Sequence, residues 1–147
     1  MPPDDVDTVR RFFEALGAAP DEPSERAETW QRLTSEDVVY VEDPRWPGSA
    51  SYEGREAVMA CWEGYAETLG VATTLSLREI RSAPDQVVAV VTVAGRARES
   101  DVPYEHTWGY VCKADRGRLT FFRAHFDPKE AFEAAGLSES PKETADE

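Results

Sequence analysis

Two side chains in the sequence combine the chemical type and the setting needed to move a proton, Asp43 and His106. Val39, Val41 and Asp43 alternate to one side of an extended stretch, so the carboxylate is expected to border the core. Loss of water there would raise the pKa of Asp43 toward that of a general base. The alternative is structural, because an aspartate before a proline often ends a strand at a turn.

His106 belongs to a segment, 102–113, that carries aromatic side chains at alternate positions, including Tyr104 and Trp108. We expect this aromatic face to line the interior of the protein. A histidine on such a face is a natural proton shuttle or ligand contact. The alternative is an imidazole that hydrogen-bonds to Glu42 or to a backbone carbonyl.

The sequence carries no motif for a metal or an organic cofactor. Its two cysteines, Cys61 and Cys112, lie far apart, and its two histidines, His106 and His125, have no neighbours at metal-ligand spacing. It contains neither a glycine-rich phosphate loop nor a nucleophile elbow. We expect no metal, no cofactor and two buried free thiols.

Composition limits the classes of partner. The 147 residues include 16 basic and 29 acidic side chains, for a formal net charge of −13. Such acidity disfavours nucleic acids and anionic membranes. A hydrophobic fraction of 41% with 10% aromatic residues indicates one globular domain. The first residues lack the basic and apolar regions of a signal peptide, so a cytoplasmic location is expected.

The elements that must position these residues follow in a simple order. Helices are expected at 5–16, 24–33, 55–69 and 127–135, and strands at 38–41, 73–81, 86–98, 102–113 and 119–126, with 45–52 as a loop or short hairpin. Short connections between strands predict antiparallel neighbours. The result is an α+β fold, residues 5–137, in which a curved antiparallel sheet wraps around helices and encloses a pocket. Residues 138–147 are expected to form a frayed acidic tail.

The last predicted strand has apolar residues on both faces, since Phe121 and Phe122 are adjacent. One face should meet the helices and the other a second subunit. We therefore expect a homodimer, with His125 at its interface.

Several segments together resemble the SnoaL-like proteins of the nuclear-transport-factor-2-like superfamily, over about residues 5–137. They are 9–16 (VRRFFEAL), 36–44 (EDVVYVEDP), 52–58 (YEGREAV), 126–131 (FDPKEA) and 134–137 (AAGL). The resemblance implies a cone-shaped cup, the cystatin-like roll. That cup serves isomerases, dehydratases, polyketide cyclases, epoxide hydrolases and non-catalytic binding modules.

The resemblance also implies roles for single positions. Residues 41–44 look like the stretch that holds the proton-shuttling aspartate of ketosteroid isomerase, which would be Asp43 here. The oxyanion tyrosine of that enzyme falls on Phe12, and its second acid falls on Gly109 or Tyr110, of which face alternation favours Tyr110. The last-strand aspartate of limonene epoxide hydrolases falls on Ala124. A true steroid isomerase or epoxide hydrolase is therefore disfavoured.

The SnoaL polyketide cyclases use an acid and a histidine, for which Asp43 and His106 are candidates. The sequence thus favours a cofactor-free isomerase, dehydratase or cyclase for a small apolar, oxygenated or polyketide-like molecule. Asp43 would move the proton, and His106 or Tyr110 would hold the oxygen. The expected walls are Phe12, Trp62, Tyr65, Trp108 and Phe126. The alternative is a non-catalytic ligand-binding or accessory dimer of the same fold.

Overall fold

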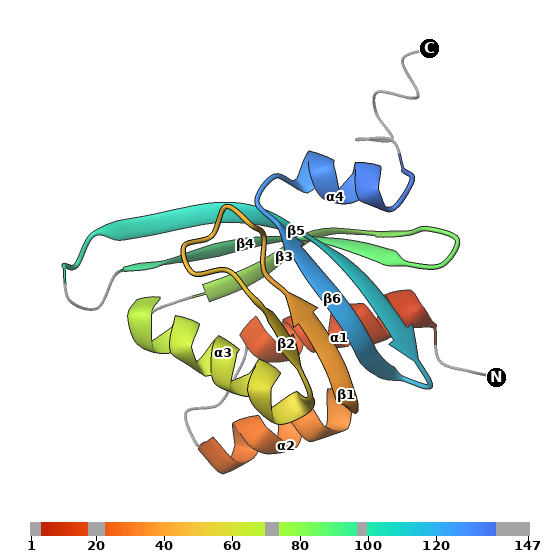
Figure 1. Ribbon diagram of the computed structural model, residues 1–147, viewed down its shortest axis with the longest axis horizontal. Coiled ribbons are helices and arrows are strands. Elements are labelled where there is room, and N and C mark those ends of the chain that lie inside the picture. The colour runs from red at the N-terminus through yellow and green to blue at the C-terminus, as the bar shows by residue number, and fades with distance from the viewer. Residues whose placement is uncertain (1–3, 18–22, 70–73, 97–99, 138–147) are drawn as a thin grey trace.

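Figure 1 shows the computed structural model, which describes residues 4–17, 23–69, 74–96 and 100–137. Its elements are, in order, α1 (Asp5–Gly17), α2 (Pro23–Leu33), β1 (Thr34–Val41), β2 (Ser51–Glu53), α3 (Arg55–Leu69), β3 (Thr74–Ser82), β4 (Val87–Arg96), β5 (Pro103–Asp115), β6 (Arg118–His125) and α4 (Pro128–Ala134). Within these ranges, no helix is long and apolar enough to cross a membrane. The tail expected at 138–147 lies outside the described residues.

The α+β architecture is confirmed, and the strands form one six-stranded sheet in the order β2-β1-β6-β5-β4-β3. Strands β3 to β6 pair antiparallel with their chain neighbours, as their short connections predict. The sheet is mostly antiparallel, as expected, and one pairing departs from this, because β1 pairs with β6 in parallel. That pairing joins segments from opposite ends of the domain, so no local turn signal announces it.

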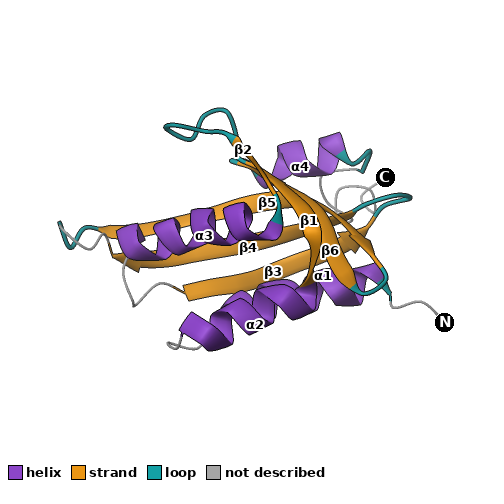
Figure 2. Cartoon of the chain, turned by 60° about the horizontal axis from the view of Figure 1, so that its bottom comes forward, coloured by secondary structure: helices purple, strands orange, loops and turns teal. Residues whose placement is uncertain are grey.

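The sheet curves around three helices and leaves the fourth outside. Figure 2 shows α1, α2 and α3 on one side of the sheet and α4 on the other. The main core fills the space between the sheet and the three helices. Its fully buried side chains include Val9, Phe12, Phe13, Val38, Val58, Val91, Leu119 and Phe122. The concave side of the sheet therefore faces the helices, as expected of a cup.

The outer face of the sheet carries a second apolar cluster that is closed by the chain itself. This cluster joins Val88, Val90 and Val111 to Ala131 and Phe132 of α4. The chain's own last helix thus covers the apolar outer face of β4 and β5, whereas the second subunit was expected on the last strand, β6.

Helix α4 is fixed at its start and along its inner side. The Asp127 carboxylate accepts a hydrogen bond from the Lys129 amide at 3.0 Å, which caps the helix as the sequence suggests. Gly109 of β5 lets the helix lie directly on the sheet. A Cβ atom at Gly109 would approach Pro128 Cα and Ala131 Cβ to 2.7 Å. The close approach of α4 to β5 therefore requires glycine at this position.

Candidate functional site

The chain carries two adjacent buried carboxylates where it leaves β1, Glu42 and Asp43. Val38 and Tyr40 face the core, with 0% and 2% of their surface exposed, and Glu42, just after the strand, continues that side at 5%. Val39 and Val41, on Asp43's side, are only partly buried. The side that carries Val38 and Tyr40 is thus the more deeply buried one along the strand, and Asp43 is itself buried, at 3%, where the chain leaves the strand.

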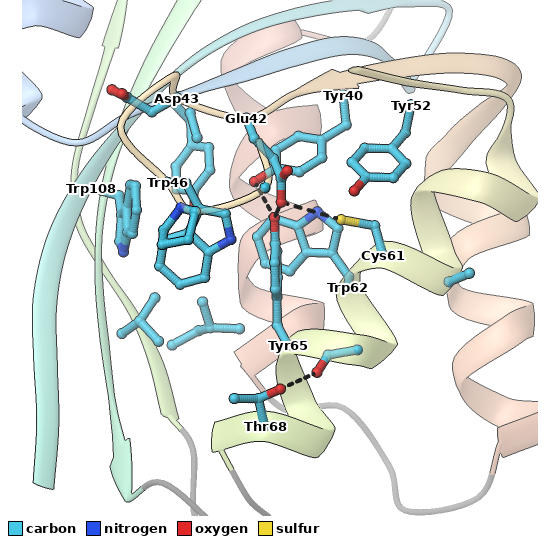
Figure 3. Close-up of a pocket in the computed structure, with 18 of the residues that line it drawn as sticks. Tyr40, Glu42, Asp43, Trp46, Tyr52, Cys61, Trp62, Tyr65, Thr68 and Trp108 are labelled. Carbon is cyan, nitrogen blue, oxygen red and sulfur yellow. Dashed lines mark hydrogen bonds between the residues drawn. The ribbon is translucent and has the colours of Figure 1, made fainter. Parts of the chain in front are cut away.

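Glu42 lies at a cavity of about 420 Å³ enclosed by the sheet, α3 and the loop after β1. Figure 3 shows its carboxylate directed toward α3. Eight aromatic residues line the cavity: Tyr40, Trp46, Tyr52, Trp62, Tyr65, Tyr104, Trp108 and Tyr110. Many of the rings touch, such as Trp46 and Trp108 with centroids 5.7 Å apart. A pocket of this size and lining suits a small, flat organic molecule.

A chain of hydrogen bonds connects Glu42 to two tyrosines. The Tyr65 hydroxyl donates to Glu42 Oε2, and the Cys61 thiol points to the same oxygen at 3.7 Å. The Ala50 amide donates to Oε1 at 3.0 Å. Because the Tyr65 hydroxyl donates its hydrogen to Glu42, its oxygen can accept a hydrogen bond from Tyr40 Oη, 3.1 Å away. Tyr40 therefore donates to Tyr65, Tyr65 donates to Glu42, and the Glu42 carboxylate is the final acceptor.

The donors of this network stay protonated at neutral pH. Burial raises the pKa of both Tyr40 and Tyr65 well above the usual tyrosine range. Burial also raises the pKa of the Cys61 thiol, which argues against a thiolate nucleophile. Tyr110, 3% exposed, lines the same cavity, and burial raises its pKa too. Around Glu42 the cavity therefore presents a carboxylate acceptor among several neutral O–H and S–H donors.

Asp43 borders the cavity, yet its oxygens are occupied elsewhere. Arg45 donates to both of them, from Nε at 3.0 Å and from a terminal nitrogen at 2.8 Å, and its amide adds a bond of 2.8 Å. The Phe126 amide donates to Oδ2 at 2.7 Å. Figure 3 shows the carboxylate pointing away from Glu42.

These bonds correct the expected pKa of Asp43. Hydrogen bonds from the Arg45 guanidinium, chiefly, and from the Arg45 and Phe126 amides lower the pKa well below its ordinary value, against an opposing effect of burial. From the sequence alone, loss of water on burial is expected to raise this pKa, and that expectation is wrong. The hydrogen bonds win because four donors converge on one carboxylate.

His106 lies beside the cavity wall rather than on it, outside the set of lining residues described. Its Nε2 is 2.6 Å from the Phe126 carbonyl oxygen, so this nitrogen carries the proton and donates. Its ring stacks on Phe126 at 4.1 Å and meets the edge of Trp108 at 4.8 Å. Of the two partners considered from sequence, Glu42 and a backbone carbonyl, the structure shows the carbonyl.

The predicted ligand-contacting residues divide into two groups. Trp62, Tyr65 and Trp108 line the cavity, as does Tyr110. Phe12 lies in the closed core against Phe13, Trp30 and Phe122. Phe126 is 40% exposed and lies at the corner before α4. The structure thus brings two catalytic candidates, Asp43 and Tyr110, and three wall candidates to one cavity, while His106 lies outside its described lining.

Sequence reasoning missed Glu42, Tyr40, Tyr52 and Trp46. The alternation of Val38, Tyr40 and Glu42 was a usable signal for the first two, but both sides of β1 carry apolar residues and either side could have been the inner one. No periodic pattern predicts Trp46, which reaches the cavity from the loop after β1.

One group outside the aromatic wall has the ligand types of a metal site. Single oxygen or nitrogen atoms of Asp43, His125 and Glu130 lie within 4.8 Å of one another. The Arg45 guanidinium already bridges the two carboxylates. A metal ion would have to displace this resident cation, so the arrangement fits an arginine-centred ion cluster better than a metal centre.

Comparison with known proteins shows which family the chain belongs to. The profile of the SnoaL-like domain matches residues 9–122. No curated protein matches the chain. Among solved structures, a protein from Jannaschia sp. CCS1 provisionally named a SnoaL-like polyketide cyclase is 16% identical, with a TM-score of 0.71 and coverage of 92% of this chain and 95% of that one.

Two other structures have the same fold. A provisionally named isomerase from Bacillus subtilis is 24% identical, with a TM-score of 0.65 and coverage of 91% and 94%. A hypothetical protein of ketosteroid isomerase-like fold from Catenulispora acidiphila DSM 44928, in complex with trimethylamine, is 15% identical, with a TM-score of 0.63 and coverage of 95% and 97%. At these identities the structures speak for the fold alone. The profile match over most of the sequence shows that this chain belongs to the SnoaL-like domain family, in the cone-shaped fold of the nuclear-transport-factor-2-like proteins.

Proposed function

We propose that the chain is a cofactor-independent enzyme of the isomerase, dehydratase or cyclase type, with Glu42 as its proton acceptor. The observation that carries the proposal is a 5% exposed carboxylate, hydrogen-bonded to a buried tyrosine pair, at an aromatic cavity of about 420 Å³. A positioned carboxylate in such a cavity can remove a proton from a carbon next to a carbonyl.

Each group near the cavity has a task in this chemistry. Glu42 takes the proton, and Tyr65 holds the carboxylate in position through its hydroxyl. Tyr110 is a neutral donor for oxygen on which negative charge develops. Asp43 acts as a positioning residue. Its bonds to Arg45 and to the Phe126 amide fasten the loop after β1, which carries Trp46, to the corner between β6 and α4.

A non-catalytic ligand-binding module of the same fold is the second candidate. It is favoured by the hydrogen bonds of Asp43 and His106, from which an acid–histidine pair was expected. His106 donates to a backbone carbonyl and Asp43 accepts from Arg45, so neither is directed at a shared ligand position. In this alternative the aromatic cavity holds a small molecule without changing it.

We also propose that the chain forms a homodimer through the outer face of β1 and β6. Val39 and Phe121 pair across these strands and are only partly buried. Lys113 lies over the Phe121 ring at 5.6 Å, and exposed Glu53 pairs with Val39 from β2. An apolar centre flanked by charges of both signs can be self-complementary across a two-fold axis.

Kemp elimination of 5-nitrobenzisoxazole tests the catalytic proposal without knowledge of the natural substrate. A base removes the C3 proton, the ring N–O bond breaks, and coloured 2-cyano-4-nitrophenolate forms. We expect the native protein to exceed Glu42→Gln by about 10²- to 10⁴-fold, because glutamine has the shape of glutamate but accepts no proton. The matched control is Glu105→Gln, an exposed position in β5, which should react like the native protein. Equal rates for all three proteins would refute the proposed base and leave the binding module.

A further inference from the structure

The charged side chains that line the cavity are all acidic. Two carboxylates, Glu42 and Asp43, are among its lining residues, and none of the described lining residues is Lys, Arg or His. Arg45 neutralises Asp43 through a salt bridge of 2.8 Å. In the described part of the chain Glu42 has no such cationic partner, and the groups that donate to it, among them a hydroxyl, a thiol and an amide, are neutral. The negative charge at Glu42 is thus hydrogen-bonded but not balanced.

Aromatic rings surround this unbalanced charge. Trp46, Trp62 and Trp108 line the cavity with Tyr65, and Trp46 lies within 5.9 Å of the Tyr65 ring centre and 5.7 Å of that of Trp108. The face of an aromatic ring is electron-rich and attracts cations, most strongly where water is excluded. Rings grouped around a carboxylate form a binding site for a positively charged organic group.

The polar atoms of the cavity indicate which kind of cation fits. The Thr68 hydroxyl already donates to Gly64, and the hydroxyls of Tyr40 and Tyr65 form one chain that ends on Glu42. A primary ammonium brings three N–H donors that each need an acceptor. A fully or largely alkylated ammonium brings none or one, and its methyl groups pack on ring faces. The lining therefore favours an alkylated ammonium.

We propose that the natural ligand of this pocket is a small organic cation with a tertiary or quaternary alkylated ammonium group. Trp46, Trp62, Trp108 and Tyr65 contact its methyl groups, and Glu42 supplies the counter-charge. The net charge of −13 attracts such a cation at long range as well. The inference names the ligand class of the pocket used in the proposed function, but it requires no turnover.

The test compares two probes of nearly equal shape, choline and 3,3-dimethylbutan-1-ol, in which an uncharged carbon replaces the nitrogen. Binding is followed by isothermal titration calorimetry. We expect choline to bind at least about tenfold more tightly than the alcohol, as cation–π contacts together with a buried counter-charge imply. In Glu42→Gln the preference should fall to near equality, while Glu105→Gln should retain it.

Several outcomes would overturn the inference. They are binding of the alcohol as tightly as choline, an unchanged preference in Glu42→Gln, or no binding of choline. A thermal melt of each variant shows that loss of preference does not reflect unfolding. The Kemp assay separates this inference from the proposed function. Choline preference without Glu42-dependent elimination supports the cation site and rejects the base, and the reverse result rejects the cation site and supports the base.

Discussion

At the scale of single residues, two adjacent carboxylates have opposite surroundings. The charged Arg45 guanidinium and two amides hold Asp43, whereas Glu42 has neutral donors and faces an aromatic cavity. The sequence showed that they point to opposite sides of the strand. It did not show which side was inside, because Val38 and Tyr40 on one side are matched by Val39 and Val41 on the other. The packing of α2 and α3 against β1 covers the side of Val38 and Tyr40.

The bonds to Asp43 predict how stability depends on acidity. Because they lower the pKa of Asp43 in the folded state, its contribution is complete above the unfolded pKa of about 3.8 and is lost as the pH falls below it. Asp43→Asn should lower the free energy of unfolding by about 1 to 3 kcal/mol at neutral pH. Urea unfolding at about pH 7 and about pH 3 should show a smaller difference between native protein and variant at the lower pH. An equal difference at both would contradict this prediction.

At the scale of elements, local sequence signals predicted where helices and turns begin and end. They did not predict which distant strands pair. The Asp127 cap, the Pro128 start and Gly136, with φ of +79°, mark α4 as expected from sequence. The segment 45–52 proved to lead into a hairpin, with β2 antiparallel to β1. The parallel pairing of β1 with β6 had no local signal, since it depends on the closure of the whole sheet.

Two glycine substitutions should have opposite effects on stability. Gly109→Ala places a Cβ 2.7 Å from Pro128 and Ala131 and should lower the free energy of unfolding by about 1 to 3 kcal/mol, because α4 must shift. Gly64→Ala, inside α3 with no heavy atom within 4 Å of the new Cβ, should raise it by up to about 1 kcal/mol. Urea denaturation of both variants measures the two effects. A neutral Gly109→Ala would show that the close packing of α4 on β5 is not required.

At the scale of the whole molecule, the cup could be predicted from the order of helices and strands. Which aromatic residues line it could be predicted only in part. Trp62, Tyr65, Trp108 and Tyr110 follow from element faces, whereas Trp46 comes from an irregular loop. Alternation along β6 did not reveal the cover of the outer face, because α4 folds back over β4 and β5 from beyond β6.

The outer face of β1 and β6 is the surface through which we expect the chain to form a dimer. We expect sedimentation equilibrium to give twice the monomer mass at micromolar concentration. Phe121→Glu should shift the equilibrium to the monomer, since it places a charge at the centre of the proposed contact. Val102→Glu, at an exposed apolar residue outside this face, is the control and should remain dimeric. A native protein that sediments as a monomer throughout the micromolar range would refute the dimer.

The most direct test of the central claim sets the two adjacent carboxylates against each other in one assay. The rate of Kemp elimination is measured for Glu42→Gln and Asp43→Asn, each at a temperature at which thermal melts show the variant folded. The structure predicts that Glu42→Gln loses about 10²- to 10⁴-fold, as expected for loss of a general base. Asp43→Asn should lose much less, because its oxygens bind Arg45 and the Phe126 amide. A greater loss in Asp43→Asn than in Glu42→Gln would contradict the assignment of Glu42 as the reactive carboxylate.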